Sequence, residues 1–199
     1  MHSSTWKFGR AFVCAALVAG AAFTARAEKH TEAAHDAMMA AAMKTASPGP
    51  QHQAIAKAMS GTWKTTTKSW MGPEPTITEG KSVLAPILGG RFVQEQHVGT
   101  LFGGPFEGVG LYGYDNAKKA YTNVWMDSFS TGIILSTGTM DASGKVLTLH
   151  GSYDDPMTGK EQTMRLVSKQ VDDNTRLLEM YGEYDGKEMK MSEVTYKRM

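Results

Sequence analysis

The chain of 199 residues lacks most of the residue patterns by which enzymes are recognised. It contains a single cysteine, Cys14, which lies in an apolar stretch near the N-terminus. The rest of the chain therefore has no disulfide, no thiol nucleophile and no thiolate metal ligand. The sequence also lacks a G-x-S-x-G elbow, a P-loop, a dinucleotide fingerprint, an H-E-x-x-H pair and an EF-hand loop. These absences exclude the enzyme classes that such motifs define, and they leave the fold as the main guide to function.

A long hydrophobic run is also missing. The apolar stretch over residues 11–23 is shorter than the roughly 20 residues that span a bilayer. Lys7 and Arg10 precede it and Ala25-Arg26-Ala27 follows it, which is the order of a secretory signal peptide and its cleavage site. We therefore predict a signal peptide over residues 1–27, cleavage near Ala27, a secreted or periplasmic mature protein, and no stable membrane insertion after cleavage. A retained N-terminal anchor is the alternative.

The chain has no large excess of charge of either sign. It holds 21 Lys and Arg residues against 20 Asp and Glu residues. Without Lys7, Arg10 and Arg26 of the predicted signal peptide, 18 basic residues face 20 acidic ones, which is a net charge of about −2. The basic residues are also dispersed, so the sequence carries no electrostatic footprint for nucleic acid and we expect no nucleic-acid partner.

Residues 28–50 form the first segment of the predicted mature chain. Residues 28–45 are rich in Ala and Met and favour a helix, which the linker Ser47-Pro48-Gly49-Pro50 ends. The histidines and methionines of this segment suggest a soft-metal site such as one for Cu(I). A loosely attached helix whose methionines contact apolar neighbours explains them more simply, so we predict no metal site. A second short helix is expected over residues 51–60, where it would cover one mouth of the domain that follows.

Residues 51–199 are predicted to form one all-β domain. Side chains alternate with period two over Phe106–Asp115 and Lys119–Asp127, as they do in strands. Neither face of these segments is purely polar, which is typical of a barrel wall around a partly polar interior. We predict a single antiparallel up-and-down β-barrel of about ten strands, with a sandwich as the alternative and with Pro86 interrupting the second strand. Turn residues recur at Asp141–Gly144, Asp154–Gly159, Asp172–Asn174 and Asp185–Gly186.

A barrel of this size can hold one small ligand. The alternation of side chains along each strand indicates which residues could contact that ligand. Aromatic residues that share a face with a few polar groups are typical of ligand pockets. We therefore predict a small apolar or amphipathic ligand as the partner. The alternative is that the same side chains fill the barrel and bond to one another, as in a structural or envelope protein. The candidate contacts are Tyr112, Tyr121, Asn123, Trp125, Arg165 and Glu193.

An enzyme acting on such a ligand is a further alternative, and no catalytic residue can be assigned from the sequence. Glu95 and His97 share one face of a strand, where a carboxylate and an imidazole suit acid–base chemistry. The glutamines around them make both faces polar, which favours an exposed outer face instead. Glu107 or Glu193 with His97 is the other acid–base pairing. We predict no cofactor, with haem iron bound by His97 or His150 as a minor alternative.

Several short motifs stand between about Gln51 and the C-terminus. They are LGGRF at residues 88–92, GGPFEGVG at 103–110, GYDN at 113–116, K-x-Y at 119–121, W-x-D at 125–127, ST at 130–131, the pairs Asp155-Pro156 and Thr158-Gly159, and EVTYKR at 193–198. Together these motifs resemble a bacterial domain family of unknown function, DUF1579. The family has no established activity, so the resemblance implies a fold and not a function. The implied fold is a barrel of the lipocalin-like or calycin type.

Two local features agree with the calycin resemblance. Gly61-Thr62-Trp63 follows a predicted short helix and is similar to the G-x-W sequence that opens the first lipocalin strand. Arg198 stands near the end of the last strand, where calycins place an arginine over that tryptophan. The resemblance therefore implies that Trp63 and Arg198 form a structural pair at the closed end of the barrel. Such a cation–π contact contributes about 0.5–2 kcal/mol.

Overall fold

The computed structural model describes residues 31–70, 72, 74–155, 158–184 and 186–199. The predicted signal peptide over residues 1–27 lies outside the described residues. The chain divides into two units, Met1–Ala46 and Ser47–Met199. In the first unit, residues 31–46 are helical and all their side chains are exposed.

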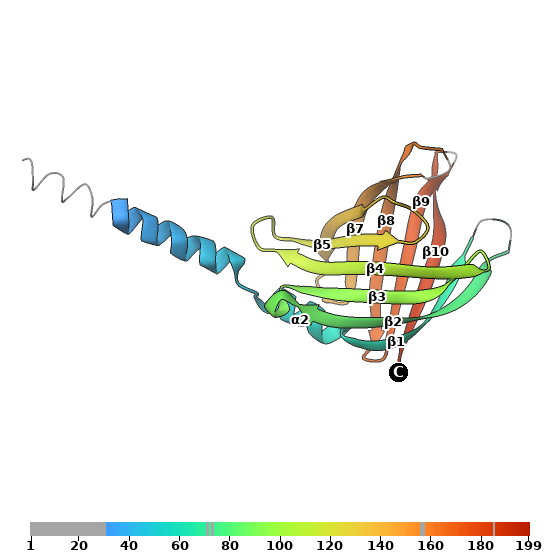
Figure 1. Ribbon diagram of the computed structural model, residues 1–199, viewed down its shortest axis with the longest axis horizontal. Coiled ribbons are helices and arrows are strands. Elements are labelled where there is room, and N and C mark those ends of the chain that lie inside the picture. The colour runs from blue at the N-terminus through green and yellow to red at the C-terminus, as the bar shows by residue number, and fades with distance from the viewer. Residues whose placement is uncertain (1–30, 71, 73, 156–157, 185) are drawn as a thin grey trace, which may run out of the picture. The chain divides into compact units, whose positions relative to one another are not determined.

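Ten antiparallel strands of the second unit close into a barrel. Each strand pairs with its neighbours in the sequence and β10 returns to pair with β1, which confirms the predicted up-and-down barrel of about ten strands. In Figure 1 the ribbons of β2 to β5 run across those of β7 to β10. The strands are β1 (Gly61–Ser69), β2 (Thr76–Ile87), β3 (Phe92–Leu101), β4 (Gly104–Asp115), β5 (Ala120–Asp127), β6 (Ile134–Met140), β7 (Val146–Asp154), β8 (Glu161–Asp172), β9 (Thr175–Tyr184) and β10 (Lys187–Arg198).

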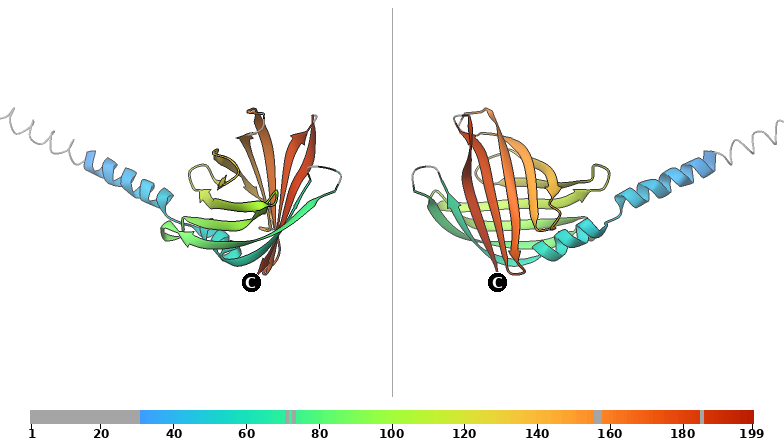
Figure 2. Two further views of the ribbon diagram at one scale, coloured as in Figure 1. Left: turned by 45° about the vertical axis from the view of Figure 1, so that its right-hand side comes forward. Right: turned by 180° about the vertical axis from the view of Figure 1, so that it is seen from behind.

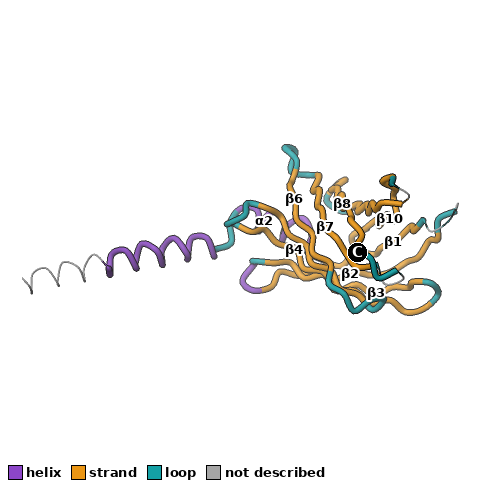
Figure 3. Tube along the Cα trace, turned by 90° about the horizontal axis from the view of Figure 1, so that it is seen from above, coloured by secondary structure: helices purple, strands orange, loops and turns teal. Residues whose placement is uncertain are grey.

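Two short helices accompany the strands. The 3-10 helix η1 (Leu88–Gly90) connects β2 to β3, and α2 (Pro50–Met59) precedes β1. Proline suits the first turn of α2 because the N–H it lacks would have no partner within the helix there. α2 packs against β2, β3 and β4, and Figure 2 shows it near the end of the barrel where the chain terminates. Figure 3 shows that strands make up most of the second unit.

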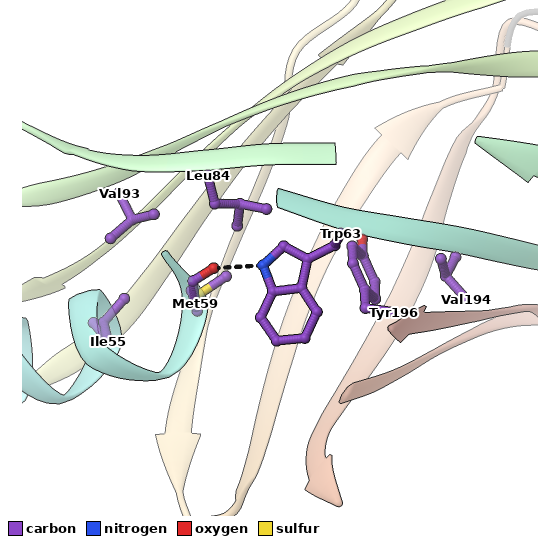
Figure 4. Close-up of a cluster of buried hydrophobic side chains, with 7 residues drawn as sticks. All are labelled: Ile55, Met59, Trp63, Leu84, Val93, Val194 and Tyr196. Atoms are coloured by element: carbon purple, nitrogen blue, oxygen red, sulfur yellow. Dashed lines mark hydrogen bonds between the residues drawn. The ribbon is translucent and has the colours of Figure 1, made fainter. Parts of the chain in front are cut away.

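The buried core lies at the α2 end of the barrel (Figure 4). Trp63 is fully buried there, and its Nε1 donates a hydrogen bond of 2.9 Å to the carbonyl oxygen of Met59 in α2. The guanidinium of Arg198 lies 4.2 Å from the centroid of the Trp63 ring, because the register of β1 and β10 pairs these two residues. Arg198 Nη1 also donates to the carbonyl oxygen of Ser60 at 2.6 Å. One tryptophan thus connects α2, β1 and β10 at the seam that closes the barrel.

Pro86 lies inside β2, where the sequence analysis expected an interruption. β2 pairs with β1 only as far as Leu84, which is opposite Gly61. Beyond that point Pro86 pairs with Val93 of β3 and has no partner on the β1 side. A proline is tolerated where one side of a strand needs no N–H donor. The expected interruption was therefore wrong, because β2 is an edge strand at this position.

An ion-pair network covers the outer wall of β8, β9 and β10. The Glu179 carboxylate accepts hydrogen bonds of 2.7 Å from both Lys169 and Lys190, and Lys190 also contacts Glu193 at 2.8 Å. The Glu179 side chain is only 8% exposed. Its hydrogen bonds to Lys169 and Lys190 lower the pKa of Glu179 from 4.5 to about 2. The carboxylate therefore stays charged and stabilises the fold over most of the acidic range.

We predict that Glu179→Gln lowers the free energy of unfolding by about 1–2 kcal/mol at pH 7, after allowance for solvent around the half-exposed lysines. Because the pKa of Glu179 is lower in the folded than in the unfolded chain, its contribution is complete above about pH 4.5 and is lost as the pH falls toward about 2. Urea unfolding at pH 7 and pH 3 measures the effect. Glu161→Gln, at the exposed start of β8, is the control. An equal gap between wild type and Glu179→Gln at both pH values would contradict the prediction.

Candidate functional site

The barrel encloses a cavity of about 320 Å³. Its wall consists of inward-facing side chains from strands around the barrel, together with Met59 at the end of α2. Most of these side chains are apolar, including Phe106, Leu149, Leu166 and Leu178. A small number of polar groups interrupt the apolar wall. This combination is typical of sites that bind small molecules.

A buried carboxylate lies beside the cavity wall. Glu95 of β3 is fully buried and receives hydrogen bonds from three hydroxyl groups. Its Oε1 accepts from Ser82 Oγ at 2.6 Å and from Tyr196 Oη at 3.3 Å, and its Oε2 accepts from Tyr112 Oη at 2.6 Å. A buried charge is costly unless hydrogen bonds replace the lost water. The hydrogen-bond network of the Glu95 carboxylate therefore takes one residue from each of the four strands β2, β3, β4 and β10.

The two tyrosines of this network stay protonated. Burial raises the pKa of both Tyr112 and Tyr196 well above the ordinary value, and the Glu95 charge raises each further. Arg176 opposes these shifts in part, which places its charge close to both phenols. Both hydroxyls consequently remain hydrogen-bond donors to Glu95 at any pH that a folded protein normally meets.

His97 extends the network into the cavity. Its Nδ1 lies 2.9 Å from Ser82 Oγ, and the single hydrogen of that hydroxyl already points to Glu95. Nδ1 of His97 must then donate to Ser82, which leaves Nε2 as the unprotonated nitrogen of a residue that lines the cavity. Burial lowers the pKa of His97, and Glu95 opposes this shift only in part. The imidazole is therefore neutral near pH 7, with a basic nitrogen that no hydrogen bond occupies among the described residues.

Two glycines make room for the rings of the cavity wall. A Cβ atom at Gly80 would lie 2.9 Å from Cε1 of His97, and one at Gly108 would collide with the ring of Trp125. Trp125 Nε1 donates to Asp127 Oδ2 at 2.8 Å, and Asp127 Oδ1 accepts from two backbone N–H groups of the loop that follows. Glycine weakens a strand, but Gly80 and Gly108 leave the space that the His97 imidazole and the Trp125 indole occupy in the cavity wall.

Arg176 of β9 is the one Lys or Arg side chain among the described residues that line the cavity. It is 6% exposed, and its guanidinium lies 5.0 Å from the ring centroid of Tyr196 and 5.7 Å from that of Trp63. In the part of the chain that the structure describes, its Nη1 atom is buried without a hydrogen-bond partner and the side chain forms no ion pair. The cavity therefore contains a cation whose hydrogen-bonding capacity is unused.

A second hollow of about 740 Å³ lies between α2 and the turns that join β6 to β7 and β8 to β9. Arg176 and Leu147 line both this hollow and the central cavity. The α2 end of the barrel is thus only partly covered by the helix.

Three of the ligand contacts predicted from the sequence come together in the cavity wall. Tyr112, Asn123 and Trp125 all line it, on β4 and β5. Tyr121 lies two residues before Asn123 on the same face of β5, nearer to α2. Its ring packs against that of Tyr114 at a centroid distance of 5.0 Å, and it lines the second hollow. The predicted face of β5 therefore spans both spaces.

The other two predicted contacts, Arg165 and Glu193, do not line the cavity, because both lie on the outer wall. Arg165 forms an ion pair of 2.6 Å with Glu188, and Glu193 belongs to the outer network around Glu179. Glu107 of the catalytic alternative and His150 of the haem alternative also lie away from the cavity, since both are exposed. Alternation along β8 places the neighbours of Arg165 inside instead.

Sequence reasoning missed two groups that matter for the site. Glu95 and His97 were favoured as exposed, because the glutamines between and beside them make both faces of β3 polar. Arg176 was not considered, although it shares one parity with Leu178 and Met180 on β9. The apolar side chains on this face of β9 could have indicated that Arg176 points into the barrel.

No group of three or more His, Cys, Asp or Glu residues within the described ranges is arranged to hold a metal ion. None of the helices in those ranges is long and apolar enough to cross a membrane. The haem alternative now concerns His97 alone, since His150 faces away from the cavity, and it stays a prediction.

We predict that Tyr112→Phe lowers the free energy of unfolding by about 1–3 kcal/mol, because it removes a short hydrogen bond to a buried carboxylate. Tyr196→Phe should cost less, since its hydroxyl lies 3.3 Å from Glu95 against 2.6 Å for Tyr112. Chemical denaturation of both variants tests this order, with Tyr181→Phe on the outer wall of β9 as the control. A Tyr112→Phe variant as stable as wild type would show that Glu95 does not need this donor.

A comparison with protein-family models relates this barrel to known sequences. The model of the family described as "Protein of unknown function (DUF1579)" matches residues 47–198, which is well over half of the chain and includes every strand of the barrel. A search of curated proteins found no match. The chain therefore belongs to the DUF1579 family of proteins of unknown function.

Proposed function

We propose that this protein is exported and that its barrel binds one small apolar or amphipathic ligand. The observation that carries the proposal is the cavity of about 320 Å³, whose wall is mostly apolar with a few polar groups. A filled barrel would leave no such space. Sites that bind small molecules typically combine an apolar enclosure with a small number of convergent polar groups.

The volume sets the size of the ligand. An apolar cavity of about 150 Å³ accommodates benzene, so a cavity of about 320 Å³ suits a molecule of roughly twelve non-hydrogen atoms. Medium-length aliphatic chains and substituted single rings fall in this range. The proposed ligand is therefore small enough to be enclosed, with its apolar part among Leu149, Leu166 and Leu178.

Export rests on the N-terminal sequence. The order of positive charge, apolar stretch and Ala25-Arg26-Ala27 over residues 1–27 is that of a cleaved signal peptide. Delivery to a secreted or periplasmic location would suit a carrier that meets its ligand outside the cytoplasm. The absence of cysteine after residue 27 is compatible with an oxidising compartment.

We predict that Thr67→Phe weakens the binding of decanol, an uncharged aliphatic probe, by at least about tenfold, because the added phenyl ring would occupy space in the cavity of about 320 Å³ that the aliphatic chain needs. Thr67 lines the cavity, whereas the adjacent Thr66 is on the opposite face of β1, so Thr66→Phe is the matched control. Trp125 also lines the cavity and its fluorescence can report occupancy. Absence of decanol binding to wild type, or equal binding by both variants, would contradict the proposal.

An enzyme is the second candidate, and the hydrogen-bonded chain from His97 through Ser82 to Glu95 favours it. A neutral imidazole held by a carboxylate network can act as a general base toward a bound substrate. Exchange of the C–H protons beside the carbonyl of 2-decanone, followed by NMR in heavy water, separates the two candidates. The binding interpretation predicts no acceleration by the protein. An acceleration that His97→Asn abolishes, while 2-decanone still binds, would favour the enzyme.

A further inference from the structure

Arg176 has the environment of a binding residue and not of a structural one. It is buried to 94% on an inward face of β9 that it shares with Leu178 and Met180. Its contacts with Tyr196 and Trp63 are to ring faces, which leave the N–H groups in the guanidinium plane without acceptors. Because Nη1 is buried and unpaired, the arginine carries a desolvation cost that the ring contacts offset only in part and that no ion pair within the described residues offsets.

The acidic groups of the cavity do not serve as its counter-ions. Both oxygens of Glu95 are taken by hydroxyl donors, and both oxygens of Asp127 are taken by Trp125 and by backbone N–H groups. Glu79, at the rim, pairs with Lys64 at 2.7 Å. Each of these carboxylates therefore has partners of its own, and none of them forms an ion pair with Arg176 among the described residues.

We propose that Arg176 binds the anionic head group of the ligand, so that the ligand is an aliphatic molecule with a single negative charge. This inference rests on the proposed binding function and specifies its ligand class. An arginine offers two parallel N–H donors to a carboxylate, which makes a carboxylate the best-fitting head group. A doubly charged phosphate would call for a second cation, and no other Lys or Arg among the described residues lines the cavity.

The position of Arg176 also gives the ligand an orientation. Trp63 and Tyr196 place the guanidinium at the α2 end of the cavity, beside the buried core. Side chains near the other strand ends, such as Phe106 and Ile134, are apolar and line the same cavity. The head group would therefore lie at the α2 end and the aliphatic tail would extend toward the opposite end.

The cavity size makes decanoate the natural probe, since a molecule of about twelve non-hydrogen atoms matches the available volume. Decanol has the same tail without the charge, and acetate has the charge without the tail. We expect wild-type protein to bind decanoate about 10- to 100-fold more tightly than decanol, because the carboxylate carries the opposite charge and can accept two hydrogen bonds from Arg176, whereas the decanol hydroxyl is neutral and has a single oxygen. Acetate should bind far more weakly than decanoate, since it buries little apolar surface.

Arg176→Gln should abolish the preference for decanoate over decanol while leaving decanol binding within about threefold of wild type. Arg165→Gln is the matched control, because it removes an arginine from the outer wall and should change neither affinity. Isothermal titration calorimetry on the mature chain measures the affinity of each of the three proteins for decanoate and for decanol. Equal binding of decanoate and decanol by wild type would overturn the inference and leave the proposed function standing. Failure of both probes to bind wild type would instead overturn the proposed function.

A measurement of stability separates a binding role from a structural one. An unpaired buried charge destabilises a fold, so Arg176→Met should leave the melting temperature of the ligand-free protein unchanged or raise it. Added decanoate should raise the melting temperature of wild type and not that of Arg176→Met. A large fall in the melting temperature of ligand-free Arg176→Met would mean that the arginine serves the core, and would overturn the inference.

Discussion

Closure of the sheet is the constraint on which the rest of the structure depends. When β10 pairs with β1, the side chains inside the barrel are shielded from bulk water to differing degrees, and a polar group that is fully buried there costs free energy unless it finds a partner. Glu95 meets this requirement with three hydroxyl donors from neighbouring strands. The Nη1 atom of Arg176 finds no such partner among the residues that the structure describes. Glu95 is thus a buried charge with partners inside the barrel, whereas Arg176 is the buried charge that the proposed ligand would pair.

The same closure explains why Trp63 has so many partners. Its indole bonds to α2, pairs across the seam with Arg198 and faces Arg176 on the cavity side of the core. The residue that completes the barrel thus also forms part of the surroundings of the proposed head-group site. A change at the seam would be expected to alter the orientation of the guanidinium as well as the stability of the barrel.

The architecture could be read from the sequence because it follows from local rules. Alternation with period two and recurring turn residues predicted the strands. The interruption expected at Pro86 was wrong, because the register of β1 and β2 leaves Pro86 without a partner on the β1 side, and this register cannot be read from the sequence. The site was harder to predict, because parity alone cannot tell which face of a strand points inward when both faces are polar. Glu95 on β3 shows this ambiguity. Arg165 was predicted as a ligand contact and Arg176 was not considered, although both lie in late strands. Only the register of β8 and β9 places one outside and the other inside.

We expect the enclosed cavity to hold a ligand in the protein as its source produces it. Native mass spectrometry of the protein purified from that source tests this expectation, because it weighs whatever the barrel retains. The account predicts a one-to-one adduct that is released when the protein is denatured, and whose fragments identify an aliphatic monoanion. A mass equal to that of the bare chain under gentle conditions, together with no uptake of any aliphatic molecule, would contradict it.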